Sequence, residues 1–173
     1  MDNFKEQLVE KIPTRADKTT KIMILVFGFF LGVLIMLFSF FYVPALMLIS
    51  LCLGGGIVYG AFWLSQKYDV EYEYIFTNGE IDIDKIEGRR NRKRLVTLDV
   101  KKATDFGVAD DSYAVPDENT LVLATSGEDG TVEYYVEANH KSLGKTTLIF
   151  TPDEEMLQLV KDALPVKIAK QNK

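Results

Sequence analysis

The sequence contains one cysteine and one histidine in 173 residues. A lone thiol, Cys52, cannot form an internal disulfide, and it excludes sites built on pairs of thiols. His140 lies in the stretch Ala138-Asn139-His140-Lys141, which is typical of a surface turn. No carboxylates have the spacing of a calcium loop, and no glycine pattern leads into the Lys-Ser/Thr of a phosphate loop. We therefore expect no enzymatic activity, no metal site and no cofactor.

Charge is absent from Ile22 to Gln66, a run of 45 residues without Asp, Glu, Lys, Arg or His. One helix crosses the apolar part of a bilayer in about 20 residues, so this run is about twice that length. Pro44 interrupts it near the middle. We predict two transmembrane helices within 22–66, at about 22–41 and 44–64. A cleaved signal peptide is disfavoured, because the first apolar stretch exceeds the roughly 7–15 residues of a signal core and no A-x-A site follows.

The cations that flank this run predict its orientation. Arg15, Lys18 and Lys21 precede the run and Lys67 follows it, whereas the turn FSFFYVP between the two spans has no charge. Cytoplasmic segments next to membrane spans are enriched in Lys and Arg. We therefore expect a multi-pass protein of the cell membrane with both termini in the cytoplasm.

Each predicted span carries a pair of glycines four residues apart, which lets helix backbones approach closely. The pairs are Gly28 with Gly32 and Gly56 with Gly60. They predict helix packing, either in a hairpin or in a dimer, although glycine is also common in membrane helices for no such reason. The spans contain few polar side chains, namely Ser39, Ser50, Cys52 and two tyrosines. This favours a membrane anchor over a path for ions.

After the spans, the sequence alternates with a period of two, which is typical of strands. Two strands are predicted, at Val70-EYEYIF-Thr77 and at Glu80-IDIDK-Ile86. Asn78-Gly79 between them predicts a hairpin with a two-residue turn. This turn pairs Phe76 with Ile81 and Tyr74 with Ile83. It also brings Glu73 opposite Asp84, which is unfavourable unless a cation such as Lys85 or one from the following basic stretch reaches them.

Five further strands are predicted at 94–100, 103–109, 119–125, 130–137 and 145–150, so that about seven antiparallel strands form one domain over 67–165. Gly127-Glu128-Asp129-Gly130 predicts a hairpin between the strands on either side of it. Thr151, Pro152 and Glu154 then predict a capping box, with Met156, Leu159, Val160 and Ala163 on one helical face and Pro165 at the end. We expect 166–173 to be a flexible basic tail.

Seven strands followed by one capping helix resemble the pleckstrin-homology (PH) fold. The layout is similar to that of bacterial membrane proteins with PH-like domains, in particular a family from Gram-positive anaerobes. The resemblance lies in EYEYIFTNGEIDIDKI directly after the second span, in the basic RRNRKR and in the ending IFTPDEEMLQLVKDALP. It implies an all-β PH-like barrel that serves as a binding or scaffolding module at the inner membrane surface.

The stretch GRRNRKR is the candidate binding site, with five cations at Arg89, Arg90, Arg92, Lys93 and Arg94. The second strand of the predicted hairpin returns the chain towards the bilayer, so this turn should lie near the anionic leaflet. Each Lys or Arg near such a surface contributes about 1 kcal/mol. The alternatives are a solvated turn that only reinforces topology, or contact with a protein partner. The net charge of −5 argues against nucleic acid.

Two classes of function remain open. One is a membrane-anchored binding or scaffold module whose basic turn contacts anionic lipid. The other is a small oligomeric membrane subunit or transporter accessory protein that assembles through its glycine-rich spans. In the cytoplasmic segment 1–21, Phe4, Leu8, Val9 and Ile12 have helical spacing. We consider an amphipathic helix there, lying either on the leaflet or against the domain.

Overall fold

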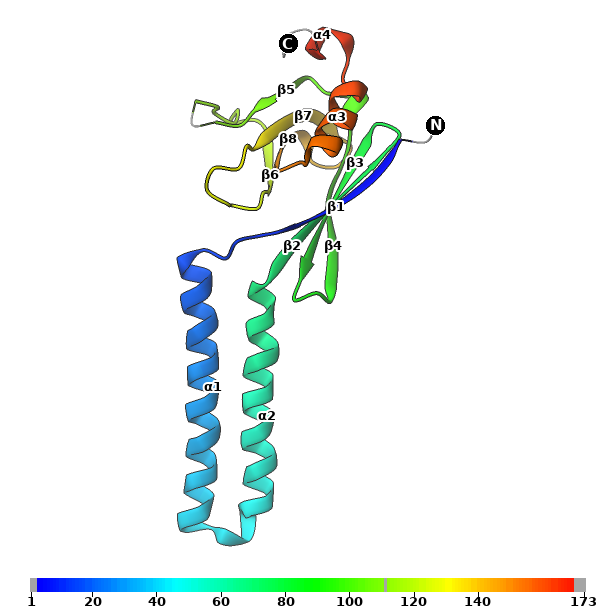
Figure 1. The fold of residues 1–173 in the computed structure, drawn as a ribbon. Coiled ribbons are helices and arrows are strands. Elements are labelled where there is room, and N and C mark those ends of the chain that lie inside the picture. Colours follow the sequence, from blue (N-terminus) through cyan, green and yellow to red (C-terminus); the bar gives the residue numbers. More distant parts are fainter. Residues whose placement is uncertain (1–2, 111, 170–173) are drawn as a thin grey trace. The chain divides into compact units, whose positions relative to one another are not determined.

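A computed structural model describes residues 3–110 and 112–169. The chain divides into two compact units, one formed by Pro13–Asp69 and the other by the segments before and after it. The first unit is a helical hairpin and the second consists of two β-sheets with a helix (Figure 1). The hairpin is thus an insertion within the β-domain, not a separate N-terminal segment. The predicted domain boundaries, 1–21 and 67–165, are wrong in this respect.

The helical unit consists of α1 (Arg15–Tyr42) and α2 (Met47–Ser65), with short 3₁₀ turns at Pro44–Leu46 (η1) and Gln66–Tyr68 (η2). Thr14 caps α1, because its side chain accepts a hydrogen bond from Asp17 N while Asp17 accepts one from Thr14 N, each at 3.1 Å. This cap extends α1 seven residues before the predicted start at 22. Pro44 begins η1 and separates the two helices, as predicted.

Both helices are long and apolar enough to cross a membrane. In their most apolar stretches only 17% and 11% of the residues are buried within the protein. The core helix of a soluble protein buries most of its apolar side chains, so these two helices require an apolar environment of another kind.

Sheet A has four antiparallel strands in the order β1-β2-β3-β4. Their bounds are Phe4–Glu10, Val70–Thr77, Glu80–Glu87 and Asn91–Asp99. Asn78 and Gly79 form the β2–β3 turn with φ of 51° and 94°. The pairs Phe76↔Ile81 and Tyr74↔Ile83 confirm the predicted register.

The segment 4–10 is strand β1 and not an amphipathic helix. Phe4, Leu8 and Ile12 are four residues apart, and for that reason they also lie on one side of a strand. Pairing decides between the two periods, because β1 lies antiparallel to β2 over its whole length, from Phe4↔Thr77 to Glu10↔Glu71. The alternation directs Lys5, Gln7 and Val9 towards the core side of sheet A.

Sheet B has the order β5-β7-β8-β6. Its strands are Asp105–Val108 (β5), Thr120–Ala124 (β6), Tyr134–His140 (β7) and Gly144–Phe150 (β8). β6 pairs with β8 in parallel, which corrects the predicted hairpin at 127–130 and the expectation that all strands are antiparallel. Residues 146–150 of β8 are buried on both faces, as expected of a central strand that requires a neighbour on each side.

The core lies between the two sheets and contains large apolar side chains from both, including Tyr74, Phe76, Ile83, Leu98, Phe106, Leu148 and Phe150. All seven predicted strands are present in the described residues, and β1 makes eight. They form two separate four-stranded sheets, so the predicted closed barrel is wrong. The buried Tyr74 hydroxyl connects the sheets, since it donates to Ala124 O and accepts from Thr151 N at 3.3 Å.

Helix α3 (Glu154–Ala163) follows β8 and buries Met156 and Val160, as predicted. Its N-cap is Asp153, whose side chain accepts from Met156 N at 2.7 Å, and not Thr151. Thr151 is buried, and its hydroxyl instead accepts from Ser126 N at 3.2 Å. A short helix α4 (Val166–Ala169) with buried Ile168 occupies the first half of the predicted flexible tail. Residues 170–173 of that tail lie outside the described residues.

Candidate functional site

The basic stretch forms the turn between β3 and β4 together with the first residues of β4. Gly88 and Arg89 have positive φ of 60° and 58°, and Glu87 pairs with Asn91. Val70 pairs with Glu87, and Glu10 pairs with Glu71. The turn therefore lies at the end of sheet A where β1 ends and β2 begins, which is the end joined through the chain to the helical unit.

A group of carboxylates occupies the face of sheet A that points away from the core, which we call the outer face. Glu73 and Asp84 lie opposite each other, as predicted, and are only 6% and 3% exposed. Glu71 and Asp82 lie beside them on the same face, two residues along each strand. Four adjacent carboxylates, two of them buried, require cations close by.

Arginines from β4 provide those cations. Arg92 contacts the Glu73 carboxylate, and its Nε lies 3.7 Å from Asp84 Oδ2. Arg94 donates to Asp84 and lies 2.7 Å from Asp82 Oδ2. The hydrogen bond to Asp84 raises the pKa of the Arg94 guanidinium. The basic stretch thus resolves the unfavourable Glu73–Asp84 pairing expected from the sequence.

A β-bulge in β4 makes these contacts possible. Ile83 pairs with Val96, but the next residue, Asp84, pairs with Arg94, so Leu95 is extra. Without the bulge, simple alternation would direct Arg94 to the same side as Val96, which is the core side. The sequence carries this signal, since Arg92 and Arg94 alternate in phase with Val96 and Leu98.

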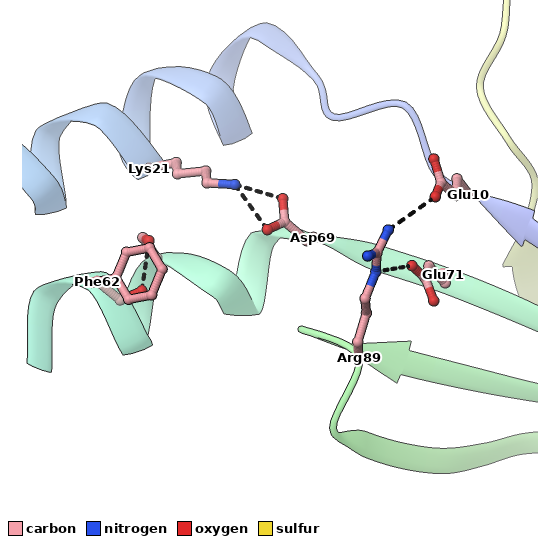
Figure 2. Close-up of polar contacts among 7 residues, drawn as sticks. Glu10, Lys21, Phe62, Asp69, Glu71 and Arg89 are labelled. Atoms are coloured by element: carbon pink, nitrogen blue, oxygen red, sulfur yellow. Dashed lines mark hydrogen bonds and ion pairs between the residues drawn. The ribbon is translucent and has the colours of Figure 1, made fainter. Parts of the chain in front are cut away.

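Arg89 is held by carboxylates at the end of the sheet. Its Nε lies 2.9 Å from Glu71 Oε1, and its Nη2 lies 3.4 Å from Glu10 Oε1 (Figure 2). The hydrogen bond to Glu71 raises the pKa of the Arg89 guanidinium. The side chain is nevertheless 76% exposed. Arg89 therefore neutralises carboxylates at the end of the sheet and is still exposed to solvent.

The other two cations of the stretch, Arg90 and Lys93, are exposed. Among the ion pairs of the described residues, neither side chain takes part in one. Lys93 pairs across the strands with Lys85, which is itself 2.7 Å from Glu87. Of the five predicted site residues, three are thus engaged by carboxylates of their own sheet. The charge open to a partner is concentrated at Arg90 and Lys93, with part of Arg89.

The four glycines of the predicted packing motifs have different surroundings. A Cβ at Gly28 would collide with Ala61, and one at Gly32 would lie 2.9 Å from Gly54 O. These positions allow α1 and α2 to approach closely. At Gly56 and Gly60, no atom of the described residues other than the adjacent backbone of α2 lies within 4 Å of such a Cβ, so these two glycines do not lie at the hairpin contact. Gly54, which the motif did not include, takes that role on α2.

His140 stabilises a turn. Its Nδ1 accepts hydrogen bonds from Ser142 N and Leu143 N, at 3.2 and 3.1 Å, and so closes the β7–β8 connection. Within residues 3–110 and 112–169, no group of three or more His, Cys, Asp or Glu side chains could hold a metal ion.

A pocket of about 410 Å³ lies along β7 and the segment before β6, and charged side chains border it. Glu137 in its wall accepts from the Tyr113 hydroxyl at 2.7 Å, and Asn119 donates to Thr147 at 3.0 Å. Lys145 forms an ion pair with Glu118 there. The pocket's charged side chains are thus occupied by one another or by neighbouring hydroxyls.

Comparison with known proteins supports the bacterial PH-like part of the relation expected from the sequence. No curated protein and no solved structure matches the chain. A family model described as "Bacterial PH-like domain (DUF6106)" matches residues 1–170. This range includes β1, the helical hairpin and both sheets. The chain therefore belongs to the DUF6106 family of bacterial PH-like domains.

Proposed function

We propose that this protein is a membrane-anchored binding module, held by α1 and α2, whose β3–β4 turn contacts anionic lipid at the cytoplasmic face. The observation that carries the proposal is the position of Arg90 and Lys93. They are exposed cations at the end of sheet A where both β1 and β2 continue into the helical unit. Lys18 and Lys21 near the start of α1, and Lys67 after α2, support a cytoplasmic location for that end.

The electrostatic contribution to lipid binding depends on how many cations of the turn are not compensated by carboxylates. About 1 kcal/mol for each Lys or Arg near an anionic leaflet gives roughly 2 kcal/mol for Arg90 and Lys93 together. Arg92 and Arg94 contribute less to lipid, because their charge is compensated by Glu73, Asp82 and Asp84. A contribution of this size orients a domain that is already tethered, whereas it would bind a free protein only weakly.

The experiment uses a soluble form of the β-domain. Lys11 N donates to Val70 O at 2.9 Å, so a short turn of Asn and Gly residues can replace residues 13–69 and close β1 onto β2. A fragment that begins at residue 67 would lack β1 and leave the sheet incomplete. Circular dichroism in the near and far ultraviolet checks that the shortened protein is folded.

Sedimentation with vesicles of phosphatidylcholine, alone or mixed with phosphatidylserine, then measures binding at low and high salt. We expect Arg90→Ala with Lys93→Ala to weaken binding to anionic vesicles about 30-fold, from the loss of about 2 kcal/mol. The matched control is Lys141→Ala with Lys167→Ala, which removes two exposed cations elsewhere in the domain. Equal binding of both double variants would exclude the turn as the lipid contact.

The second candidate is an oligomeric membrane subunit. One observation favours it: in the part of the chain that the structure describes, nothing beyond the adjacent backbone of α2 lies within 4 Å of where a Cβ at Gly56 or Gly60 would stand. A second copy could pack against this surface of α2. Native mass spectrometry of the full chain in mild detergent tests this candidate. A defined oligomer that dissociates in Gly56→Leu with Gly60→Leu supports it, and a monomer in both forms excludes it.

A further inference from the structure

Strand β1 forms one border of sheet A, and within residues 3–110 and 112–169 no strand pairs with its second side. Lys11 N donates to Val70 O, and Asn78 N donates to Asn3 O. The odd-numbered residues of β1 therefore direct their backbone groups at β2. In an antiparallel ladder the residues between them direct their N–H and C=O groups to the other side. Ile12 confirms the alternation, because its N–H binds Ser126 O, outside the sheet, at 2.7 Å.

The residues with outward backbone groups also have exposed side chains in a regular pattern. They are Phe4, Glu6, Leu8 and Glu10, in which apolar and acidic side chains alternate. Phe4 is 60% exposed and Leu8 is 56% exposed. No ion pair of the described residues includes Glu6. Glu10 forms an ion pair with Arg89 at 3.4 Å, and Arg89 also binds Glu71. This edge therefore presents free hydrogen-bonding groups, apolar surface and negative charge at a strand's spacing.

The other edges of the two sheets are protected or carry no charge pattern. β4 carries a bulge and the cations Arg92, Lys93 and Arg94, which discourage pairing with another chain. β5 has only four residues. β6 exposes Leu121 and Leu123 but has no charged residue that would select a partner. β1, with seven residues, is the longest edge that combines exposed apolar side chains with charge.

We propose that the free edge of β1 binds an extended segment of another protein in which every second residue is in turn apolar and basic, because side chains on one face of a strand are two residues apart. The segment adds a fifth strand to sheet A, and its main chain bonds to the outward groups of Phe4, Glu6, Leu8 and Glu10. Its apolar residues lie opposite Phe4 and Leu8, and its cations lie opposite Glu6 and Glu10. Opposite charges at facing positions stabilise such a pair, and like charges destabilise it.

The same charges disfavour a second copy of β1 as the occupant. In an antiparallel pair of two β1 strands, one register brings Glu6 opposite Glu6, and another brings Glu6 opposite Glu10. The register between these two brings carboxylates opposite Phe4 and Leu8. Each arrangement lacks the cation that the pattern requires, so the complementary partner is basic and of different sequence.

The test uses the full chain in nanodiscs of neutral lipid, so that lipid charge does not compete. The probes are a fluorescent peptide of repeated Val-Thr-Lys-Thr (the Val-Lys peptide), its counterpart of repeated Val-Thr-Glu-Thr (the Val-Glu peptide), and a Val-Lys peptide with Pro in the middle; each places Val and the charged residue in turn on one face of the strand. Fluorescence anisotropy measures binding. Hydrogen exchange locates it, because an added strand slows exchange of the outward amides of Phe4, Glu6 and Leu8. We expect saturable binding of the Val-Lys peptide alone.

Glu6→Lys with Glu10→Lys should weaken the Val-Lys peptide at least tenfold and allow the Val-Glu peptide to bind. The control, Glu128→Lys with Asp129→Lys, changes the net charge equally in the exposed loop after β6. Leu8→Pro removes an outward donor without removing a β1–β2 hydrogen bond, and it should also weaken binding. Equal effects of both charge reversals, or exchange protection away from β1, would overturn the proposal. So would protection of β1 that requires no peptide and rises with protein concentration, since the occupant would then be a second copy.

Discussion

Removal of both Arg92 and Arg94 should destabilise the β-domain, although neither side chain belongs to the apolar core. In Arg92→Ala with Arg94→Ala, Glu73 and Asp84 stay buried and opposite each other without a cation. A buried carboxylate without a partner must recover water, take up a proton or disrupt its surroundings. Each outcome lowers the free energy of unfolding.

The magnitude follows from the exposure of the two partners. Breaking a fully buried ion pair on one side costs about 3–5 kcal/mol. Here the acids are buried, but the side chains of Arg92 and Arg94 are 52% and 46% exposed, so water already screens part of the interaction. We therefore expect about 1–2 kcal/mol for each arginine. The double variant should lose about 2–4 kcal/mol, which lowers Tm by roughly 10 °C for a domain of this size.

The assay is urea and thermal unfolding of the soluble β-domain, followed by circular dichroism. Arg90→Ala with Lys93→Ala is the matched control, because it removes two cations of the same turn that form no ion pair with the described residues, and its Tm should change little. Addition of Glu73→Gln and Asp84→Asn to the arginine variant should restore part of the stability, since the buried charges are then gone. If the arginine variant unfolds at the same urea concentration as the control variant, the arginines do not stabilise this face.

Three further predictions concern other parts of the molecule. Gly54→Leu should lower the thermal stability of the full chain in detergent, because a side chain there meets Gly32 O and Met36. Gly56→Leu should not affect the stability of a monomer, and equal losses in the two variants would contradict the observed helix contact. Burial and a hydrogen bond to Asp105 raise the pKa of Tyr135 from 10.0 to about 12. The folded domain therefore holds this proton more tightly than the unfolded chain and loses stability as the pH rises from 10 to 12. The free energy of unfolding in urea should depend less on pH over this range in Tyr135→Phe. His140→Ala removes the acceptor for Ser142 N and Leu143 N and should cost about 0.5–1.5 kcal/mol, while His140→Asn should retain much of the stability; the same urea assay compares the two.

Local signals in the sequence predicted the part of the fold that local interactions determine. Asn78-Gly79 specifies a two-residue turn, and a turn of fixed length leaves one register for β2 and β3. The apolar face of α3 was predicted for the same reason, because Met156 and Val160 are one helical turn apart. In both cases the residues that decide the structure lie within a few positions of each other.

The parts of the fold that the sequence did not predict are determined by pairing between strands far apart in the chain. The apolar residues of 4–12 fit a helix and a strand equally well, and their partner β2 begins about 60 residues later, beyond the helical hairpin. The parallel β6–β8 pair likewise depends on the burial of β8 on both faces, because the turn-forming residues at 127–130 alone suggest a hairpin. The bulge at Leu95 was also missed, but here a local signal was present. Arg92 and Arg94 alternate in phase with the core residues of the same strand, and this conflict is visible in the sequence.

The bulge divides the basic stretch into cations of two kinds. It directs Arg92 and Arg94 to the buried carboxylates, and it leaves Lys93 on the opposite side of β4 and Arg90 in the turn. Stability and binding should therefore separate by residue, although all five cations lie within seven positions. In the crossed comparison, Arg92→Ala with Arg94→Ala should lower stability and largely retain vesicle binding, and Arg90→Ala with Lys93→Ala should do the reverse. Loss of both properties in either pair would show that the turn acts as one charged cluster, in which the carboxylates compensate no cation selectively.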